Sequence, residues 1–272
     1  MPELPEVETV CRGLEKILQN KPVIKRVRLL RKDLRFPIPP RLPRALSGEV
    51  IIGVRRRAKY LLFDTESVIL LNHLGMTGSW RLLARNEELG KHDHCLIELA
   101  DGRVLAFRDP RRFGLLDLIK PGQEAVHPRL KDLGVEPLDG FSAELLLVKS
   151  RKRKVPIKVL LMNQKIVVGI GNIYASEVLF RAGVRPTRSS GTLTRGECAR
   201  IVEAVKKVLV SAIRAGGSSI RDYRNLGGEE GGFQDQHLVY ERAGEPCSIC
   251  KTAIKSKVMA GRSTYWCPRC QS

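Results

Sequence analysis

Residues 247–270, CSICKTAIKSKVMAGRSTYWCPRC, decide the fold at the C-terminal end of this 272-residue chain. Two Cys-x-x-Cys pairs, Cys247 with Cys250 and Cys267 with Cys270, stand sixteen residues apart, a spacing typical of zinc sites with four thiolate ligands. Four thiolates complete the tetrahedron around zinc and leave no position for a substrate. The sequence therefore predicts a small finger that holds one structural zinc ion.

The alternative for these four cysteines is a pair of disulfides, which persist in oxidising compartments. The first ten residues lack the basic and then apolar pattern of a signal peptide, and the longest apolar runs, near Val68 to Leu71, have only strand length. We therefore expect a cytoplasmic protein with no membrane association, in which metal ligation is favoured. Cys11, Cys95 and Cys198 are scattered along the chain and are expected to fill apolar cores.

The charge balance indicates a polyanionic partner. Lys and Arg total 48 against 29 Asp and Glu, which gives a formal net charge of +19 at pH 7. Such a balance favours nucleic acid or an anionic membrane surface. Between the two cysteine pairs, a segment of hairpin character carries Lys251, Lys255, Lys257 and Arg262, which suit a phosphate backbone or form only a solvated face.

The hydrophobic pattern of the first half predicts one helix followed by strands. Apolar residues recur at helical spacing from Pro5 to Leu18. Short apolar segments then continue to about residue 119, and Asp101-Gly102 is a hairpin signal. This pattern is typical of a β-sandwich or barrel. The expected strand segments are 23–30, 49–64, 67–75, 94–100 and 103–109.

The second half is predicted to be helical. After residues 121–140, which are rich in proline, glycine and charge, apolar residues return at helical spacing. The clearest helix starts at a capping box formed by Thr194 and Glu197, and two consecutive glycines end it. Residues 218–234 show little periodicity, which is typical of a mobile loop that covers a ligand or of a plain connector.

Two loops place a large apolar side chain beside glycine after a strand. These are NHLGMTG, residues 72–78, with Met76, and DPRRFG, residues 109–114, with Phe113. Apolar wedges can enter a duplex step and fill the gap left by an extruded nucleotide, while a neighbouring arginine bonds the orphaned base. The alternative is that both side chains are core residues at strand ends.

A third glycine-rich turn, VVGIGNIYASEVLF at residues 167–180, leads into a helix that is expected to begin near Asn172. Backbone N–H groups at such a helix start can bind an anion. A tight connection between helices is the alternative.

The opening residues, MPELPEVETV, concentrate acids in a basic protein. Removal of Met1 would leave the secondary amine of Pro2 free, and an α-amino group has an ordinary pKa of roughly 7.7 to 8.0. Such an amine can attack an aldehydic carbon and form an iminium. Glu3 and Glu6 could move protons beside it, or they could simply favour the dipole of the first helix.

The chain resembles the bacterial formamidopyrimidine-DNA glycosylases in segments that span nearly its whole length. In chain order these are PELPEVET, RRRAKYLL, HLGMTG, KHDH, DPRRFG, VVGIGNIYASE and the CSIC and GRSTYWCPRC parts of the finger. The resemblance implies an α+β multidomain fold. Its parts are an N-terminal β-sandwich catalytic domain with an N-terminal helix (1–134), a helix-two-turns-helix DNA-binding domain (135–236) and the C-terminal zinc finger (237–272).

The resemblance also implies an activity. A base-excision repair enzyme of this kind, both DNA glycosylase and AP lyase, removes 8-oxoguanine opposite cytosine and formamidopyrimidines from duplex DNA, then cleaves the strand by β,δ-elimination. Pro2 would attack C1′ and Glu3 would donate and accept the proton. Lys59 would contact phosphate and aid β-elimination, and Arg262 would aid δ-elimination. The expected enzyme is a monomer associated with the nucleoid.

The resemblance further implies a set of DNA-binding residues. Met76, Arg111 and Phe113 match residues that fill the hole and contact the estranged cytosine. The positions expected to hold the backbone around the flipped nucleotide are His73, His92, Lys154, Lys158, Asn172 and Tyr240. Two departures are Glu241, where the family usually has glycine, and Gly231-Gly232-Phe233, where an aromatic pair is common.

Two rival functions are weighed against this one. A relative directed at oxidised pyrimidines shares the nucleophile and fold, but it opens with a different peptide after Pro2 and lacks the Met, Arg, Phe trio in this form. A zinc-finger DNA-binding protein without activity would bind DNA tightly with strong salt dependence. The presence of both Pro2 and Glu3 argues against this second rival.

Overall fold

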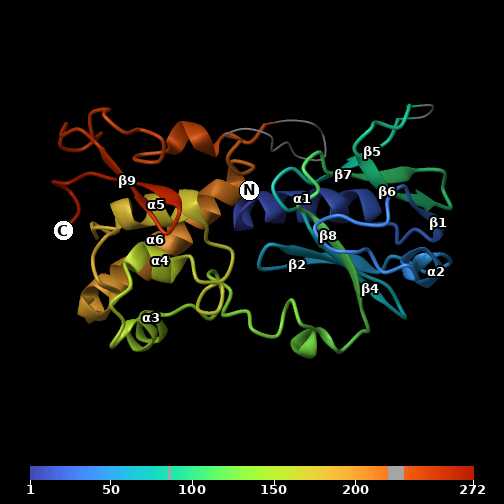
Figure 1. Ribbon diagram of the computed structural model, residues 1–272, viewed down its shortest axis with the longest axis horizontal. Coiled ribbons are helices and arrows are strands. Elements are labelled where there is room, and N and C mark those ends of the chain that lie inside the picture. Colours follow the sequence, from blue (N-terminus) through green and yellow to red (C-terminus); the bar gives the residue numbers. More distant parts are fainter. Residues whose placement is uncertain (85–86, 220–229) are drawn as a thin grey trace. The chain divides into compact units, whose positions relative to one another are not determined.

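The computed structural model describes residues 1–84, 87–219 and 230–272. Its chain forms two compact units, Met1–Lys131 with Gly216–Gly232, and Asp132–Ala215 with Phe233–Ser272 (Figure 1). Of the loop expected at residues 218–234, the part from 220 to 229 lies outside the described residues. Among the helices that are described, none is long and apolar enough to cross a membrane.

The first unit begins with helix α1 (Leu4–Leu18), close to the helix expected from Pro5 to Leu18. Glu3 is its N-cap and forms a capping box with Glu6, which satisfies backbone donors at the helix start. The face with Val7, Val10 and other apolar residues is buried against the sandwich core.

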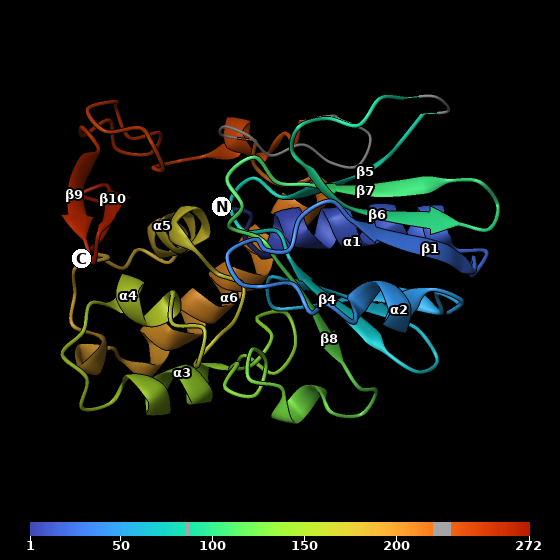
Figure 2. The same cartoon turned by 45° about the vertical axis from the view of Figure 1, so that its right-hand side comes forward.

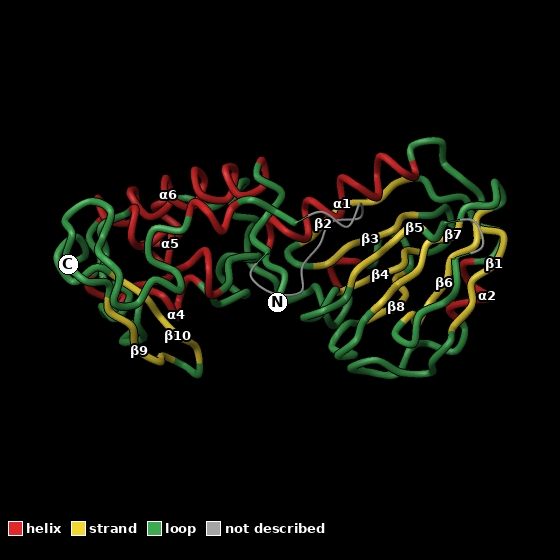
Figure 3. Tube along the Cα trace, turned by 90° about the horizontal axis from the view of Figure 1, so that it is seen from above, coloured by secondary structure: helices red, strands yellow, loops and turns green. Residues whose placement is uncertain are grey.

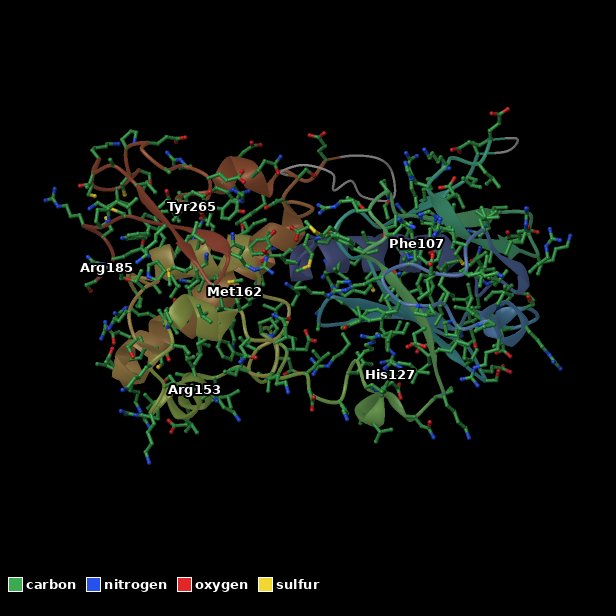
Figure 4. The ribbon with its side chains drawn as sticks, in the orientation of Figure 1. Phe107, His127, Arg153, Met162, Arg185 and Tyr265 are labelled. Atoms are coloured by element: carbon green, nitrogen blue, oxygen red, sulfur yellow. The ribbon has the colours of Figure 1, made fainter. Side chains whose placement is uncertain are left out.

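Two four-stranded antiparallel sheets follow, with strand orders β1-β6-β7-β5 and β2-β3-β4-β8 (Figure 3). Trp80 packs on Phe63 and Phe107 with ring centroids 5.1 and 5.2 Å apart. Because Phe63 and Phe107 come from different sheets, this stack closes the core; Phe107 lies among the strands in Figure 4. The elements are β1 (Ile24–Leu29), α2 (Leu42–Leu46), β2 (Gly53–Arg57), β3 (Tyr60–Asp64), β4 (Ile69–His73), β5 (Ser79–Leu82), β6 (Asp93–Leu99), β7 (Val104–Arg108), β8 (Leu115–Ile119) and η1 (Glu124–Val126).

The structure refines the strand predictions at one segment. Residues 49–64, expected as one strand segment, form two paired strands, β2 and β3. The chain reverses at Ala58, which has a φ of 54°, and at Lys59. The sequence RRRAK at residues 55–59 contains no glycine or proline that would mark this reversal. Strands β5 and β8 are not among the expected segments.

Helices dominate the second unit. Helix α6 packs against α3 and α5, and the β9-β10 hairpin lies beside α5 (Figure 2). The predicted capping box of Thr194 and Glu197 is present, and the helix ends before two glycines with positive φ. The elements are α3 (Ala143–Ser150), α4 (Ile157–Leu161), α5 (Asn172–Arg181), η2 (Ser190–Thr192), α6 (Arg195–Arg214), η3 (Phe233–Gln236), β9 (Lys255–Met259) and β10 (Arg262–Trp266).

Candidate active site and DNA-binding residues

The N-terminal residues are held in place by the carboxylate of Glu6. Its Oε2 accepts the N–H of Glu3 at 2.7 Å, and its Oε1 accepts the N–H of Ser218 at 2.8 Å. Glu3 and Glu6 are 3% and 2% exposed, and Pro2 is buried beside them in sequence. Because both oxygens of Glu6 accept backbone amides, this carboxylate positions the start of the chain.

A further glycine supports the same arrangement. Gly217 has a φ of 84°, and a Cβ at this position would lie 2.7 Å from Oε1 of Glu6. The positive φ favours glycine, and a Cβ there would displace the carboxylate of Glu6, so glycine suits the close approach of Ser218 to Glu6. Glu6 thus ties the start of α1 to the residues that follow α6 in sequence.

Lys59 lies in the turn between β2 and β3 and is only 6% exposed. The positive φ of Ala58 sets this tight turn. Nearby on β2, Arg56 donates to Glu8 of α1 at 2.8 Å, a half-buried ion pair that ties the strand to the helix. The burial and the turn give Lys59 a defined position in the same unit as Pro2.

His73, at the end of β4, is a neutral hydrogen-bond donor. Its Nδ1 accepts the N–H of Gly75 at 2.9 Å, so the proton of the neutral ring is on Nε2. Burial, then the nearby charges of Lys59 and Arg35, lower the pKa of His73 to about 4. His73 and Phe113 line a cavity of about 180 Å³ together with two arginines, Arg35 and Arg129.

This depressed pKa predicts a pH effect on stability. Between pH 6.5 and about 4, His73 is protonated in the unfolded chain but stays neutral in the folded protein. The free energy of unfolding should therefore fall as the pH falls. The wild type should lose roughly 1 kcal/mol more per pH unit than His73→Gln over this window. Urea unfolding at pH 7.5, 6 and 5 measures this difference, and parallel curves for the two proteins would contradict it.

The three residues expected to fill a gap in DNA lie in one unit. Phe113 is 42% exposed, Arg111 is exposed and Met76 is half-buried. The guanidinium of Arg111 lies over the ring of Phe113, 4.8 Å from its centroid, in the geometry of a cation–π contact. An exposed phenylalanine stacked with an exposed arginine is not a core residue, which excludes the core alternative for Phe113.

His92 is half-buried and lies next to an acid that sequence reasoning missed. The buried carboxylate of Asp93 accepts the N–H of Gly90 at 2.7 Å and is paired with Arg81 at 2.7 Å. These contacts fix the end of the loop that carries His92. An acid inside the otherwise basic KHDH segment was the available signal.

In the second unit, Lys158 and Asn172 form one network with the hairpin. The buried Nζ of Lys158 donates to Oδ1 of Asn172 at 2.6 Å, to Oγ1 of Thr264 at 2.8 Å and to the carbonyl of Ser263 at 3.1 Å. Asn172 also donates to the carbonyl of Ser263 at 3.0 Å. Lys158 therefore joins α4, the start of α5 and β10, while Lys154 is exposed.

Tyr240 is positioned by Glu177, another residue that sequence reasoning missed. The fully buried carboxylate of Glu177 accepts the N–H groups of Leu238, Val239 and Tyr240 at 2.9 to 3.1 Å. Its ion pair with Arg181 completes the cluster. The phenol of Tyr240 is 3.5 Å from Nδ2 of Asn172, and its ring packs edge-on against Tyr265, labelled in Figure 4.

Glu241, the next residue, has a φ of 61°. This left-handed conformation is strained for a residue with a Cβ but not for glycine. We expect Glu241→Gly to raise the free energy of unfolding by about 0.5 to 1 kcal/mol. Lys206→Gly, within helix α6, is the control and should lower it by about 1 kcal/mol. Denaturant unfolding of both variants measures this, and destabilisation by Glu241→Gly would contradict the assignment of strain.

The four cysteines of the finger meet the geometry of a zinc site. Their sulfur atoms all lie within 4.8 Å of one another. Sγ of Cys247 is 3.9 Å from Sγ of Cys270, and Sγ of Cys250 is 3.4 Å from Sγ of Cys267. Thiolates about 2.3 Å from one zinc ion would lie roughly 3.8 Å apart. The set therefore fits one structural zinc, and Arg262 is the exposed first residue of hairpin strand β10.

Three family models match successive parts of this chain. Residues 1–116 match the N-terminal domain of formamidopyrimidine-DNA glycosylase, residues 133–224 its H2TH domain, and residues 244–272 the zinc finger found in FPG and IleRS. The chain belongs to the formamidopyrimidine-DNA glycosylase family. Its matching finger domain and its four clustered cysteines together establish one structural zinc.

Individual family members are similar over their full lengths. Formamidopyrimidine-DNA glycosylases of Bdellovibrio bacteriovorus and Thioalkalivibrio sulfidiphilus are 49% and 48% identical to this chain, with 100% of each chain covered. A mutant Lactococcus lactis FPG, solved in complex with a Fapy-dG containing DNA, superposes with a TM-score of 0.92 at 36% identity and full coverage of both chains. The MutM (FPG) protein of Thermus thermophilus gives a TM-score of 0.88 at 40% identity, covering 99% of this chain and 98% of that one.

Proposed function

We propose that this family member is a base-excision repair enzyme that removes oxidised purines, chiefly 8-oxoguanine and formamidopyrimidines, from duplex DNA and then cleaves the abasic strand. The observation that carries the proposal is the buried Pro2-Glu3 start of α1, held by the carboxylate of Glu6 in a chain that matches the family over its whole length. A DNA-binding protein without activity would not need this arrangement.

The proposed chemistry uses the N-terminal amine. After loss of Met1, the nitrogen of Pro2 attacks C1′ of the flipped nucleotide and the damaged base leaves with a proton. The C1′–O4′ bond of the sugar then breaks, O4′ takes a proton, and the nitrogen of Pro2 forms an iminium with C1′. The iminium draws electrons toward C1′ and so acidifies the C2′ proton. Loss of that proton expels the 3′ phosphate, and a second elimination expels the 5′ phosphate. Glu3 is the group proposed to donate and accept protons beside the amine.

The other side chains are assigned to DNA. Lys59 and the neutral Nε2–H of His73 suit phosphate oxygens, and Arg262 is proposed to aid the second elimination. Lys154, His92, Asn172 and Tyr240 are proposed to hold the backbone around the flipped nucleotide. Lys158 is proposed to support these residues from the protein side, because its three described hydrogen bonds go to protein atoms.

Met76, Arg111 and Phe113 are proposed to fill the gap in the duplex, with Arg111 reading a cytosine opposite the lesion. We also propose that the enzyme is a cytoplasmic monomer associated with the nucleoid. The proposed domain boundaries follow residues 134 and 236.

Comparison of two lesions tests the substrate class. In single-turnover assays, 8-oxoguanine opposite cytosine should be excised at least about tenfold faster than thymine glycol in the same sequence context. An undamaged duplex is the control for non-specific cleavage. Faster excision of thymine glycol would move the protein to the oxidised-pyrimidine branch, and tight binding with no excision would leave only a DNA-binding function.

A further inference from the structure

The loops that carry Met76 and Phe113 touch each other through their backbones. Gly75 has a φ of 66°, and a Cβ there would lie 2.3 Å from the carbonyl carbon of Phe113. No side chain fits at such a distance, so glycine is required for the approach. The loop after β4 and the loop after β7 therefore pack directly against each other.

The buried carboxylate of Asp109 connects the two loops by hydrogen bonds. Asp109 is 0% exposed, its Oδ1 accepts the hydroxyl of Thr77 at 2.6 Å, and its Oδ2 accepts the N–H of Gly114 at 2.7 Å. Its backbone carbonyl accepts a hydrogen bond from Nε2 of His94 at 2.9 Å. Hydrogen bonds to an ionised carboxylate are about twice as strong as neutral ones. Asp109 thus holds both ends of its own loop and one residue of the other.

Thr77 links Asp109 to Arg111, the arginine proposed to read the opposite cytosine, through two hydrogen bonds. The N–H of Arg111 donates to Oγ1 of Thr77 at 3.0 Å, while the hydroxyl proton of Thr77 goes to Asp109. The hydroxyl is therefore used both as acceptor and as donor. Thr77 follows Met76 directly, and Arg111 stacks on Phe113, so this one hydroxyl connects the positions of all three side chains.

We propose that Asp109 and Thr77 are positioning residues that lock Met76, Arg111 and Phe113 into one preformed reading unit. Neither needs to touch DNA. The lock removes the conformational freedom that the two loops would otherwise lose on entering the duplex. The effect of the lock on the reaction rate should be largest for a DNA in which a damaged base must be unstacked and the opposite base read. It should be smallest for an abasic site, where the base is already missing. The inference rests on the proposed function.

Variants of Thr77 test the lock with little change in shape. Thr77→Val replaces the hydroxyl by a methyl group, Thr77→Ala removes it without adding bulk, and Thr77→Ser keeps it as the matched control. For each, we would measure single-turnover excision of 8-oxoguanine opposite cytosine and opposite adenine. Cleavage of a preformed abasic site in the same duplex and thermal unfolding complete the set.

Loss of the hydroxyl should lower the ratio of 8-oxoguanine excision to abasic-site cleavage by at least about tenfold. The preference for cytosine over adenine opposite the lesion should fall with it, and Thr77→Ser should stay within about twofold of the wild type. Equal losses on both DNA substrates, or no loss in either hydroxyl-free variant, would overturn the lock. An inactive wild type would instead reject the proposed function, so the two failures are distinguishable.

Discussion

Replacing Pro2 by glycine is expected to lower the yield of a borohydride-trapped adduct with 8-oxoguanine DNA by about 100-fold. The secondary amine of proline forms an iminium that stays cationic, because its nitrogen has no proton to lose. Glycine is a primary amine, so its iminium still carries a proton on nitrogen. Loss of that proton gives a neutral imine, which draws electrons toward C1′ much less strongly. The reaction is followed by gel shift after reduction, with single-turnover strand cleavage measured in parallel.

Pro5→Ala is the matched control, since Pro5 lies in the first turn of α1 and only Pro2 is proposed to react. This variant should keep the adduct within a few-fold of the wild type, about the effect expected of a helix-start substitution. Equal trapping by wild type and Pro2→Gly would reject the proline as nucleophile. Intact-mass measurement adds a separate check, because fully active protein that still carries Met1 would contradict a free proline amine.

The second large effect is expected from the zinc site. Cys267→Ser should lower affinity for lesion-containing DNA by about 100-fold, because metal binding supplies the folding free energy of small finger domains. The finger core has few buried apolar residues, among them Val239 and Ile254. Without the metal, the hairpin would release the Ser263 and Thr264 oxygens that Lys158 now binds.

Fluorescence anisotropy at fixed salt measures this affinity, and metal analysis should find about one zinc per wild-type chain. Cys198→Ser is the control, since Cys198 lies in the core of the second unit and away from the finger cluster in sequence. This control should retain zinc and DNA affinity. Wild-type affinity in a zinc-free Cys267→Ser protein would contradict a structural role for the metal.

Local chemistry in the sequence was enough for the elements whose signals lie within a few residues. The capping box at Thr194 predicted the start of α6, and the cysteine spacing predicted the zinc ligands. The helical spacing of Val7 and Val10 predicted α1. The helix signals lie one turn apart and the two cysteines of each pair lie within one knuckle, so short-range spacing carries the information.

The turn between β2 and β3 could not be found in the same way. Ala58 adopts its positive φ because pairing of the two strands over five residue pairs outweighs a local preference. The carboxylate of Glu6 likewise reaches the amide of Ser218, 212 residues away in the chain. Such contacts have no spacing signature.

The sequence by itself determined the family motifs, the nucleophile candidate, the metal ligands and the residues expected to face DNA. Only the tertiary structure decided what the buried acids do. Asp93, Asp109 and Glu177 each accept backbone or side-chain donors that position a neighbouring residue proposed to bind DNA. The physical reason is that a buried carboxylate must be matched by donors, and folding alone brings those donors from distant segments to the same point.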